Sequence, residues 1–129
     1  MLVVDASVLA PVIADSGDDG HRFRRRLRGE TIAGPDLLRV EVMSVLRRHA
    51  GIGDLTPGQA DAAVGDLLEF PVRIFPTNPL MRRVWELRPN LSAYDGCYVA
   101  LAEAVGAPLL TADRRLARAP GPRCRIEAI

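Results

Sequence analysis

Short apolar runs alternate with longer stretches of helical periodicity along the chain. The apolar runs predict strands at 2–5, 31–34, 72–75 and 108–111, with a fifth, less regular run at 124–127. Helical spacing of apolar residues predicts helices at about 7–14, 19–28, 36–50, 57–69, 79–88, 93–105 and 113–118. Because apolar strands that alternate with helices form parallel sheets covered on both faces, the pattern predicts a three-layer α/β domain.

Residues that begin and end helices support these boundaries. Thr56 followed by Pro57 is typical of an N-cap with proline at the first helical position. Gly29, Gly51 and Gly106 stand where three of the predicted helices should stop.

Length and composition point to one ordinary domain. The chain has 129 residues, 48% hydrophobic and 26% charged, so it can bury a core without a disulfide or a structural metal. It has no apolar stretch long enough for a transmembrane helix, and no basic segment before its first apolar run. Cys97 and Cys124 are too few for a zinc site. We therefore expect a soluble cytoplasmic domain.

The basic residues exclude several kinds of chemistry. All 17 are arginine, and the chain contains no lysine. Schiff-base catalysis, the Walker-A phosphate loop and the lysine-assisted phospho-aspartate sites all require a lysine. The sequence therefore argues against phosphatase and phosphotransfer domains that use a similar α/β scaffold. Asp5-Ala6-Ser7 also lacks the Asp-x-Asp start of such phosphatases.

Four acidic residues from separate segments are predicted to meet at one edge of the sheet. Asp5 ends the first predicted strand, and Asp113 follows the strand at 108–111. Glu41 lies in the second turn of the helix predicted at 36–50, and Asp95 in the first turn of the helix at 93–105. Helices next to parallel strands run antiparallel to them, so all four acids should lie at the carboxyl edge, where open α/β sheets bind ligands.

The surroundings of these acids favour a cation between them. Asp95 shares its helix face with Val99 and Ala102, and Glu41 borders the apolar face of its own helix. Carboxylates that are clustered and partly buried repel one another unless a cation neutralises them, and oxygen ligands suit Mg²⁺ or Mn²⁺. Each acid also has a plainer interpretation, since Asp5, Asp95 and Asp113 could serve helix N-termini and Glu41 could simply lie at the edge of the apolar face of its helix.

The ordered set of motifs resembles the PIN-domain family, and specifically the VapC-like toxins of toxin–antitoxin modules. The matching pieces span nearly the whole chain in order: Val3-Val4-Asp5-Ala6-Ser7, Pro35 through Leu38 to Glu41 and Leu46, Asp95 with Tyr98-Val99-Ala100-Leu101-Ala102, and Leu110-Thr111-Ala112-Asp113 with Leu116. The chain departs from some relatives at Arg114 and Arg115, where they carry a further acid. The number of metal ions, one or two, is left open by this departure.

The resemblance implies a three-layer α/β/α PIN-like domain over residues 1–129, with a central parallel sheet of about five strands. It implies an endoribonuclease that depends on Mg²⁺ or Mn²⁺, with Asp5, Glu41, Asp95 and Asp113 as catalytic residues and metal ligands. Ser7 would support Asp5 through a hydrogen bond, and Thr111 would brace the loop that carries Asp113. The implied partners are an RNA substrate, a cognate antitoxin and a second copy in a homodimer, with no membrane.

Several alternatives stay open at this point. A catalytically silent PIN-like module could bind RNA or protein and use its acids for a structural ion. The arginines of 22–28 could form a solvated face or an edge that contacts RNA or a partner. His21 and His49 fall outside the motifs and are expected to be ordinary surface or packing residues. The apolar helix at 7–14 could belong to the core or to an interface.

Overall fold

The computed structural model describes residues 1–129 and contains the five strands that the apolar runs predicted. The strands are β1 (Leu2–Val4), β2 (Ile32–Pro35), β3 (Arg73–Phe75), β4 (Leu109–Thr111) and β5 (Ile126–Ala128). The helices are α1 (Ala6–Ala14), α2 (Asp18–Leu27), α3 (Leu38–Gly51), α4 (Pro57–Glu69), α5 (Met81–Leu87), α6 (Ala93–Val105) and α7 (Arg114–Arg118), with a 3₁₀ turn, η1 (Asn78–Leu80), before α5.

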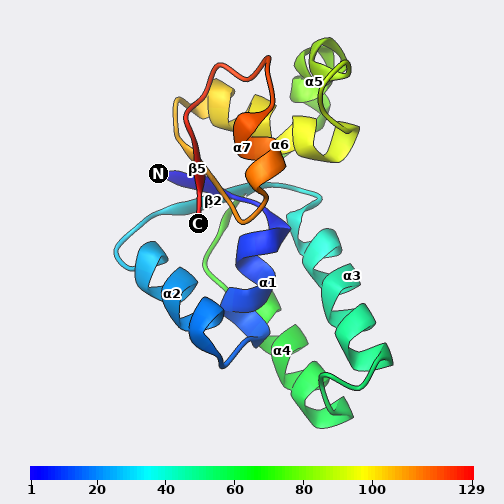
Figure 1. The fold of residues 1–129 in the computed structure, drawn as a ribbon. Coiled ribbons are helices and arrows are strands. Elements are labelled where there is room, and N and C mark those ends of the chain that lie inside the picture. Colours follow the sequence, from blue (N-terminus) through cyan, green and yellow to red (C-terminus); the bar gives the residue numbers. More distant parts are fainter.

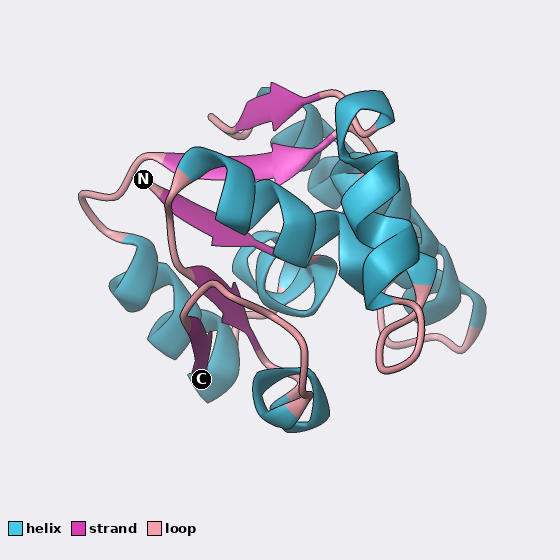
Figure 2. Cartoon of the chain, turned by 90° about the horizontal axis from the view of Figure 1, so that it is seen from above, coloured by secondary structure: helices cyan, strands magenta, loops and turns pink.

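All strands are parallel and form one sheet in the order β3-β2-β1-β4-β5. Helices α1 to α4 lie on one face of the sheet, and α5 and α6 lie on the other (Figures 1 and 2). This arrangement confirms the predicted three-layer α/β/α architecture with a five-stranded parallel sheet.

The strand order places a crevice between β1 and β4. From β1 the chain proceeds through β2 to β3 toward one edge, and it then returns to β4 and proceeds to β5 at the other edge. Right-handed crossovers put the connecting helices of these two halves on opposite faces, so the loops after β1 and β4 separate at their carboxyl ends. Asp5 and Asp113 are the residues that follow these two strands closely.

Some boundaries differ from those predicted. The first strand ends at Val4, because Asp5 already serves as the N-cap of α1. Helix α3 begins at Leu38 rather than at 36, since the N–H of Asp36 still bonds to the carbonyl of Phe75 beside the sheet. Glu41 is therefore in the first turn of α3, not the second.

The predicted helix stops are right at Gly29 and Gly106, where the backbone turns into the left-handed region. At the end of α3 the predicted stop is one residue early, because the helix ends at Gly51 and not at 50. Gly51 is still helical, and Gly53 takes the positive φ of 85° instead. Thr56 and Pro57 begin α4 as predicted, and Gln59 completes a capping box with Thr56.

The core resolves the open question about the first helix. Val8 and Leu9 of α1 are fully buried, and Val12 is nearly so, within one apolar cluster that includes β1 and β4. Helix α1 contacts α2, α3 and α4, so its apolar face belongs to the core.

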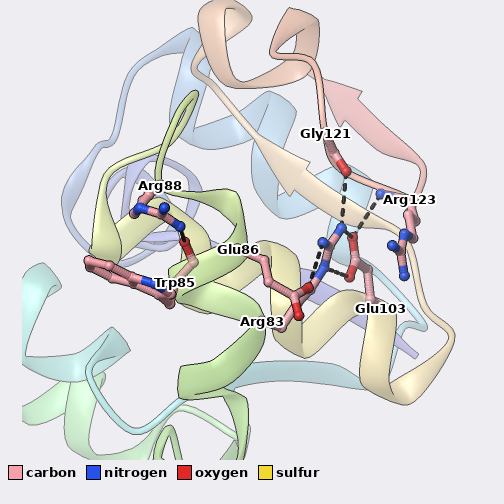
Figure 3. Close-up of polar contacts among 7 residues, drawn as sticks. All are labelled: Arg83, Trp85, Glu86, Arg88, Glu103, Gly121 and Arg123. Atoms are coloured by element: carbon pink, nitrogen blue, oxygen red, sulfur yellow. Dashed lines mark hydrogen bonds and ion pairs between the residues drawn. The ribbon is translucent and has the colours of Figure 1, made fainter.

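Two ion-pair groups fasten distant segments around the sheet. Arg83 on α5 donates to Glu103 on α6 at 2.7 and 3.1 Å and to the carbonyl of Gly121 at 3.0 Å, and the N–H of Arg123 also donates to Glu103 (Figure 3). On the other side, Arg26 donates to Glu127 of β5 at 2.8 and 3.0 Å. These contacts hold the segment after α7 and the edge strand β5 in place.

None of the helices combines the length and the apolar character needed to cross a lipid bilayer.

The close approach of α2 to the end of α1 gives a test of this packing. Gly20 lies against the backbone carbonyl of Asp15, and a Cβ at this position would overlap that carbonyl. We expect Gly20→Ala to lower the free energy of unfolding by about 2 kcal/mol in a denaturant titration. Gly65→Ala on α4 is the control, because a Cβ there meets no other atom, and it should raise stability by up to about 1 kcal/mol. Equal effects of the two substitutions would contradict the packing.

Candidate active site

The carboxylate of Asp5 is buried at the crevice between β1 and β4. Only 6% of the residue is exposed. Its Oδ1 accepts hydrogen bonds from the Ser7 N–H at 3.0 Å and from the Ser7 hydroxyl, and its Oδ2 accepts one from the hydroxyl of Thr111. No buried side-chain oxygen or nitrogen in the structure lacks a hydrogen-bond partner, so these hydroxyls replace the water that Asp5 has lost.

The same two hydroxyls connect the turns after β1 and β4. The Ser7 Oγ accepts the N–H of Ala112 at 2.9 Å, and the Thr111 Oγ1 accepts the N–H of Asp113 at 3.0 Å. The contacts expected for Ser7 with Asp5 and for Thr111 with the loop of Asp113 are thus both present. Thr111 does more than was expected, because it also bonds directly to Asp5.

Glu41 reaches the same crevice from α3 and is held by a residue that the sequence interpretation gave no role. The hydroxyl of Tyr98 donates to Glu41 Oε1 at 2.7 Å. The Tyr98 residue is only 1% exposed, and its spacing of three residues from Asp95 on α6 was the available signal. Burial, together with the hydrogen bond to Glu41, raises the pKa of Tyr98 strongly, so the hydroxyl stays protonated and donates.

Asp95 and Asp113 complete the set of four acids. Asp95 is half-buried in the first turn of α6, whose N-cap Ser92 accepts the Asp95 N–H at 3.1 Å. Asp113 is the N-cap of α7, and its Oδ1 accepts the N–H of Arg115 at 2.8 Å. The plainer capping interpretation is therefore correct for Asp5 and Asp113, and it coexists with their position in the crevice.

Burial and mutual repulsion disfavour the charged forms of three of these acids. Burial is the largest cause of a raised pKa at Asp5, Glu41 and Asp95. The charge of Asp95 adds to the shifts of Asp5 and Glu41, and the charge of Asp113 adds to that of Asp95. Burial also raises the pKa of Asp113, but hydrogen bonds from Arg115 outweigh it and the pKa is lowered. The four acids thus form one electrostatically connected group.

The donor chemistry of this group fits a hard divalent cation. Its side chains offer only oxygen atoms, from carboxylates and hydroxyls, and no basic side chain forms an ion pair with Asp5, Glu41 or Asp95. Such uncompensated, partly buried negative charge is typical of sites for Mg²⁺ or Mn²⁺. The structure contains no group of three or more Asp, Glu, His or Cys side chains arranged as a preformed metal site. The acids therefore share the crevice without forming a closed cage.

The arginines of 22–28 divide between solvent and structural contacts. Arg24 donates to the carbonyl of Val12 at 2.9 Å, Arg26 pairs with Glu30 and Glu127, and Arg22 pairs with the exposed Asp19. The solvated-face interpretation therefore holds for the exposed Arg22, Arg25 and Arg28, whereas Arg24 and Arg26 are half-buried and make structural contacts.

The two histidines stay outside the crevice. The ring of His49 pairs with Asp54 at 2.9 Å, and that of His21 lies 3.5 Å from Arg24. Both are ordinary surface contacts, as the sequence interpretation expected.

The buried charge of Asp5 predicts how stability depends on pH. Because the folded-state pKa of Asp5 is raised, the carboxylate costs folding free energy above that pKa, and the cost disappears as the pH falls through it. We expect Asp5→Asn, unfolded by denaturant in EDTA, to be more stable than the parent at neutral pH. The difference should shrink at acidic pH. A variant less stable than the parent at neutral pH would contradict the assignment of the cost to this charge.

The Tyr98 hydroxyl gives a second prediction. It lowers the pKa of Glu41, so Tyr98→Phe should raise that pKa further and cost about 1 kcal/mol of stability. An NMR titration of the Glu41 carboxyl carbon measures the shift. Tyr94→Phe is the matched control, because Tyr94 is exposed and its hydroxyl forms no hydrogen bond. An unchanged Glu41 pKa in Tyr98→Phe would show that the hydrogen bond does not form in solution.

Comparison with known proteins identifies the family. The sequence model of the PIN domain family matches residues 2–122 of this chain. Ribonuclease VapC12 of Mycobacterium tuberculosis is 36% identical over 129 residues, which cover 100% of this chain and 99% of that protein.

Solved structures show the same fold. The Mycobacterium tuberculosis VapC20 structure, described as a sarcin-ricin loop cleaving toxin, superposes with a TM-score of 0.70 at 20% identity, covering 92% of this chain and 94% of that one. A toxin–antitoxin complex from Klebsiella pneumoniae superposes with a TM-score of 0.70 at 18% identity, covering 99% and 97%. With Asp5, Glu41, Asp95 and Asp113 gathered at the crevice of this fold, the chain belongs to the PIN domain family and, within it, to the VapC group.

Proposed function

We propose that this chain is the toxin of a toxin–antitoxin pair, a metal-dependent endoribonuclease that hydrolyses RNA phosphodiester bonds at the crevice between β1 and β4. The observation that carries the proposal is the buried Asp5 carboxylate, held by two hydroxyls and surrounded by three more acids without a basic partner for Asp5, Glu41 or Asp95. The ribonuclease relatives supply the reaction, since this chain is 36% identical to VapC12 over its full length.

The metal is part of the proposal. Asp5, Glu41, Asp95 and Asp113 would hold Mg²⁺, or Mn²⁺ in its place, directly or through water. A bound divalent ion lowers the pKa of a water molecule and offsets the charge that develops on the phosphate oxygens. The raised pKa values of Asp5, Glu41 and Asp95 fit this role, because a cation would relieve the repulsion that raises them.

The side chains around the acids contribute orientation. Ser7 and Thr111 fix both oxygens of Asp5, so this carboxylate has little freedom to turn. Tyr98 occupies one oxygen of Glu41 and leaves the other available. The N-termini of α1, α3, α6 and α7 carry the four acids, and their partial positive charges help the carboxylates remain ionised.

A protein partner follows from the same assignment. The Klebsiella pneumoniae structure of the same fold is a toxin–antitoxin complex, and we propose that this chain likewise binds a cognate antitoxin. The homodimer implied by the family resemblance stays a prediction, which sedimentation of the purified chain would test.

RNA cleavage by the purified, antitoxin-free chain tests the proposal. Structured RNAs, tRNA included, are incubated with Mg²⁺ or Mn²⁺ and, in parallel, with EDTA. We expect discrete cleavage that requires the metal and is lost in Asp5→Asn. Thr111→Val, which removes one hydrogen bond from Asp5 and one from the Asp113 turn, should lower cleavage by about 10- to 100-fold.

Asp66→Asn is the control, because Asp66 is an exposed acid on α4 that has no ion pair. It should cleave like the parent. Cleavage that survives in Asp5→Asn would indicate a contaminating ribonuclease. No cleavage of any RNA, with RNA or partner binding intact, would favour a catalytically silent binding module.

A further inference from the structure

An open groove begins at Glu41 and follows α3 away from the sheet. It has a volume of about 860 Å³, and its lining includes Glu41, Ser44, Arg47, Arg48, Ile52 and Tyr94. The α3 residues of this set recur every three or four positions, so they share one face of the helix. From Glu41 to Gly51, the last lining residue within α3, this face is about 15 Å long, at 1.5 Å per residue. Figure 1 shows α3 leading away from the end of β2.

The two ends of the groove differ in charge. The sheet end carries Glu41, which interacts electrostatically with Asp5 and Asp95. Farther along lie Arg47 and Arg48, both exposed and neither with an ion pair or side-chain hydrogen bond. By contrast, Arg26 and Arg83 are neutralised by carboxylates. Two adjacent uncompensated guanidinium groups attract anions, and phosphates accept paired hydrogen bonds from arginine.

An aromatic ring from a second helix, α6, also lines the groove. Tyr94 is 65% exposed, and it directly precedes Asp95 in the first turn of α6. The ring is therefore beside the acid group and lines the same groove as Arg47 and Arg48. Exposed aromatic rings next to basic side chains stack unpaired bases, largely regardless of sequence.

We infer that this groove binds the single-stranded RNA next to the scissile phosphate, with Arg47 and Arg48 contacting backbone phosphates and Tyr94 stacking a base. The inference rests on the proposed function, because it takes the acid group at Glu41 as the site of cleavage. A base in a duplex is paired and stacked, so it cannot reach an aromatic side chain. The groove thus selects RNA whose nucleotides beside the cleavage site are unpaired, as in a loop.

A binding experiment without metal tests this inference separately from cleavage. The probe is a short fluorescein-labelled single-stranded RNA in EDTA, and its anisotropy is followed at several salt concentrations. Tyr94→Ala should weaken binding about 10-fold, while Tyr94→Trp should bind like the parent. The double variant Arg47→Ala, Arg48→Ala should also weaken binding about 10-fold. Its log affinity should depend less steeply on log salt, by about 1.4, because each phosphate that is no longer neutralised lowers the slope by about 0.7.

Two matched substitutions control for charge and aromatic content. Arg25→Ala removes one exposed, unpaired arginine from α2, which lies on the other side of α1 from α3 (Figures 1 and 2). Trp85→Ala removes a ring that is 62% exposed on α5 and stacks on Arg88 (Figure 3), outside the groove. Both should bind the RNA within about 2-fold of the parent if the groove is the principal contact.

Three outcomes would overturn the inference. Unchanged RNA affinity in Tyr94→Ala and in the arginine double variant would exclude the groove. A larger loss from Trp85→Ala than from Tyr94→Ala would move base stacking to α5. A change of sedimentation from dimer to monomer in the groove variants, with RNA affinity unaltered, would make the groove an interface between protein copies. Normal binding in EDTA with no metal-dependent cleavage would refute the proposed function and leave RNA binding by the groove supported.

Discussion

The placement of one carboxylate away from water governs the geometry of the crevice. Asp5 is buried where β1 meets β4, and burial in an apolar core is tolerable only because hydroxyls from two different turns bond to it. The same hydroxyls accept backbone N–H groups from the turn after β4. One polar cluster therefore satisfies the carboxylate, sets the path of both turns and fixes where α1 and α7 begin. Burial raises the pKa of Asp5, so the ionised carboxylate lowers the free energy of unfolding at neutral pH.

Like Asp5, the other three acids are brought to the crevice by the N-terminus of a helix that lies beside the end of a strand. Glu41 lies in the first turn of α3, Asp95 in that of α6, and Asp113 caps α7. Helix capping by Asp5 and Asp113 is thus compatible with the catalytic role proposed for them, since the helix end that each stabilises also supports its charge. Arg26 and Arg83 pair with acids outside the crevice, and the only crevice acid with an ion pair is Asp113, which contacts Arg115. Asp5, Glu41 and Asp95 therefore have no ion-pair partner.

Hydrophobic periodicity in the sequence predicted most of the fold, because each apolar run and each helix has a local signature. The bounds of α4 and α6 were predicted fully, with Thr56 as a clear start residue and Gly106 as a clear stop. Tertiary contacts decided the remainder. The hydrogen bond from the Asp36 N–H to the Phe75 carbonyl delays the start of α3 by two residues, which places Glu41 in its first turn rather than its second. The bond between Tyr98 and Glu41 joins two helices across 57 positions, so the local spacing of Tyr98 could place it on the Asp95 face of α6 but could not reveal Glu41 as its partner.

The hydrogen bond from Thr111 to Asp5 joins residues 106 positions apart. A nascent chain that has not yet extended through Thr111 lacks both this bond and the carboxylate of Asp113, and it contains no arrangement of acids equivalent to the finished crevice. Under the proposed function, such a chain is harmless to the RNA around the ribosome until almost the whole domain has emerged and folded. The long sequence separation thus delays completion of the crevice until Thr111 and Asp113 have been synthesised and have folded into place.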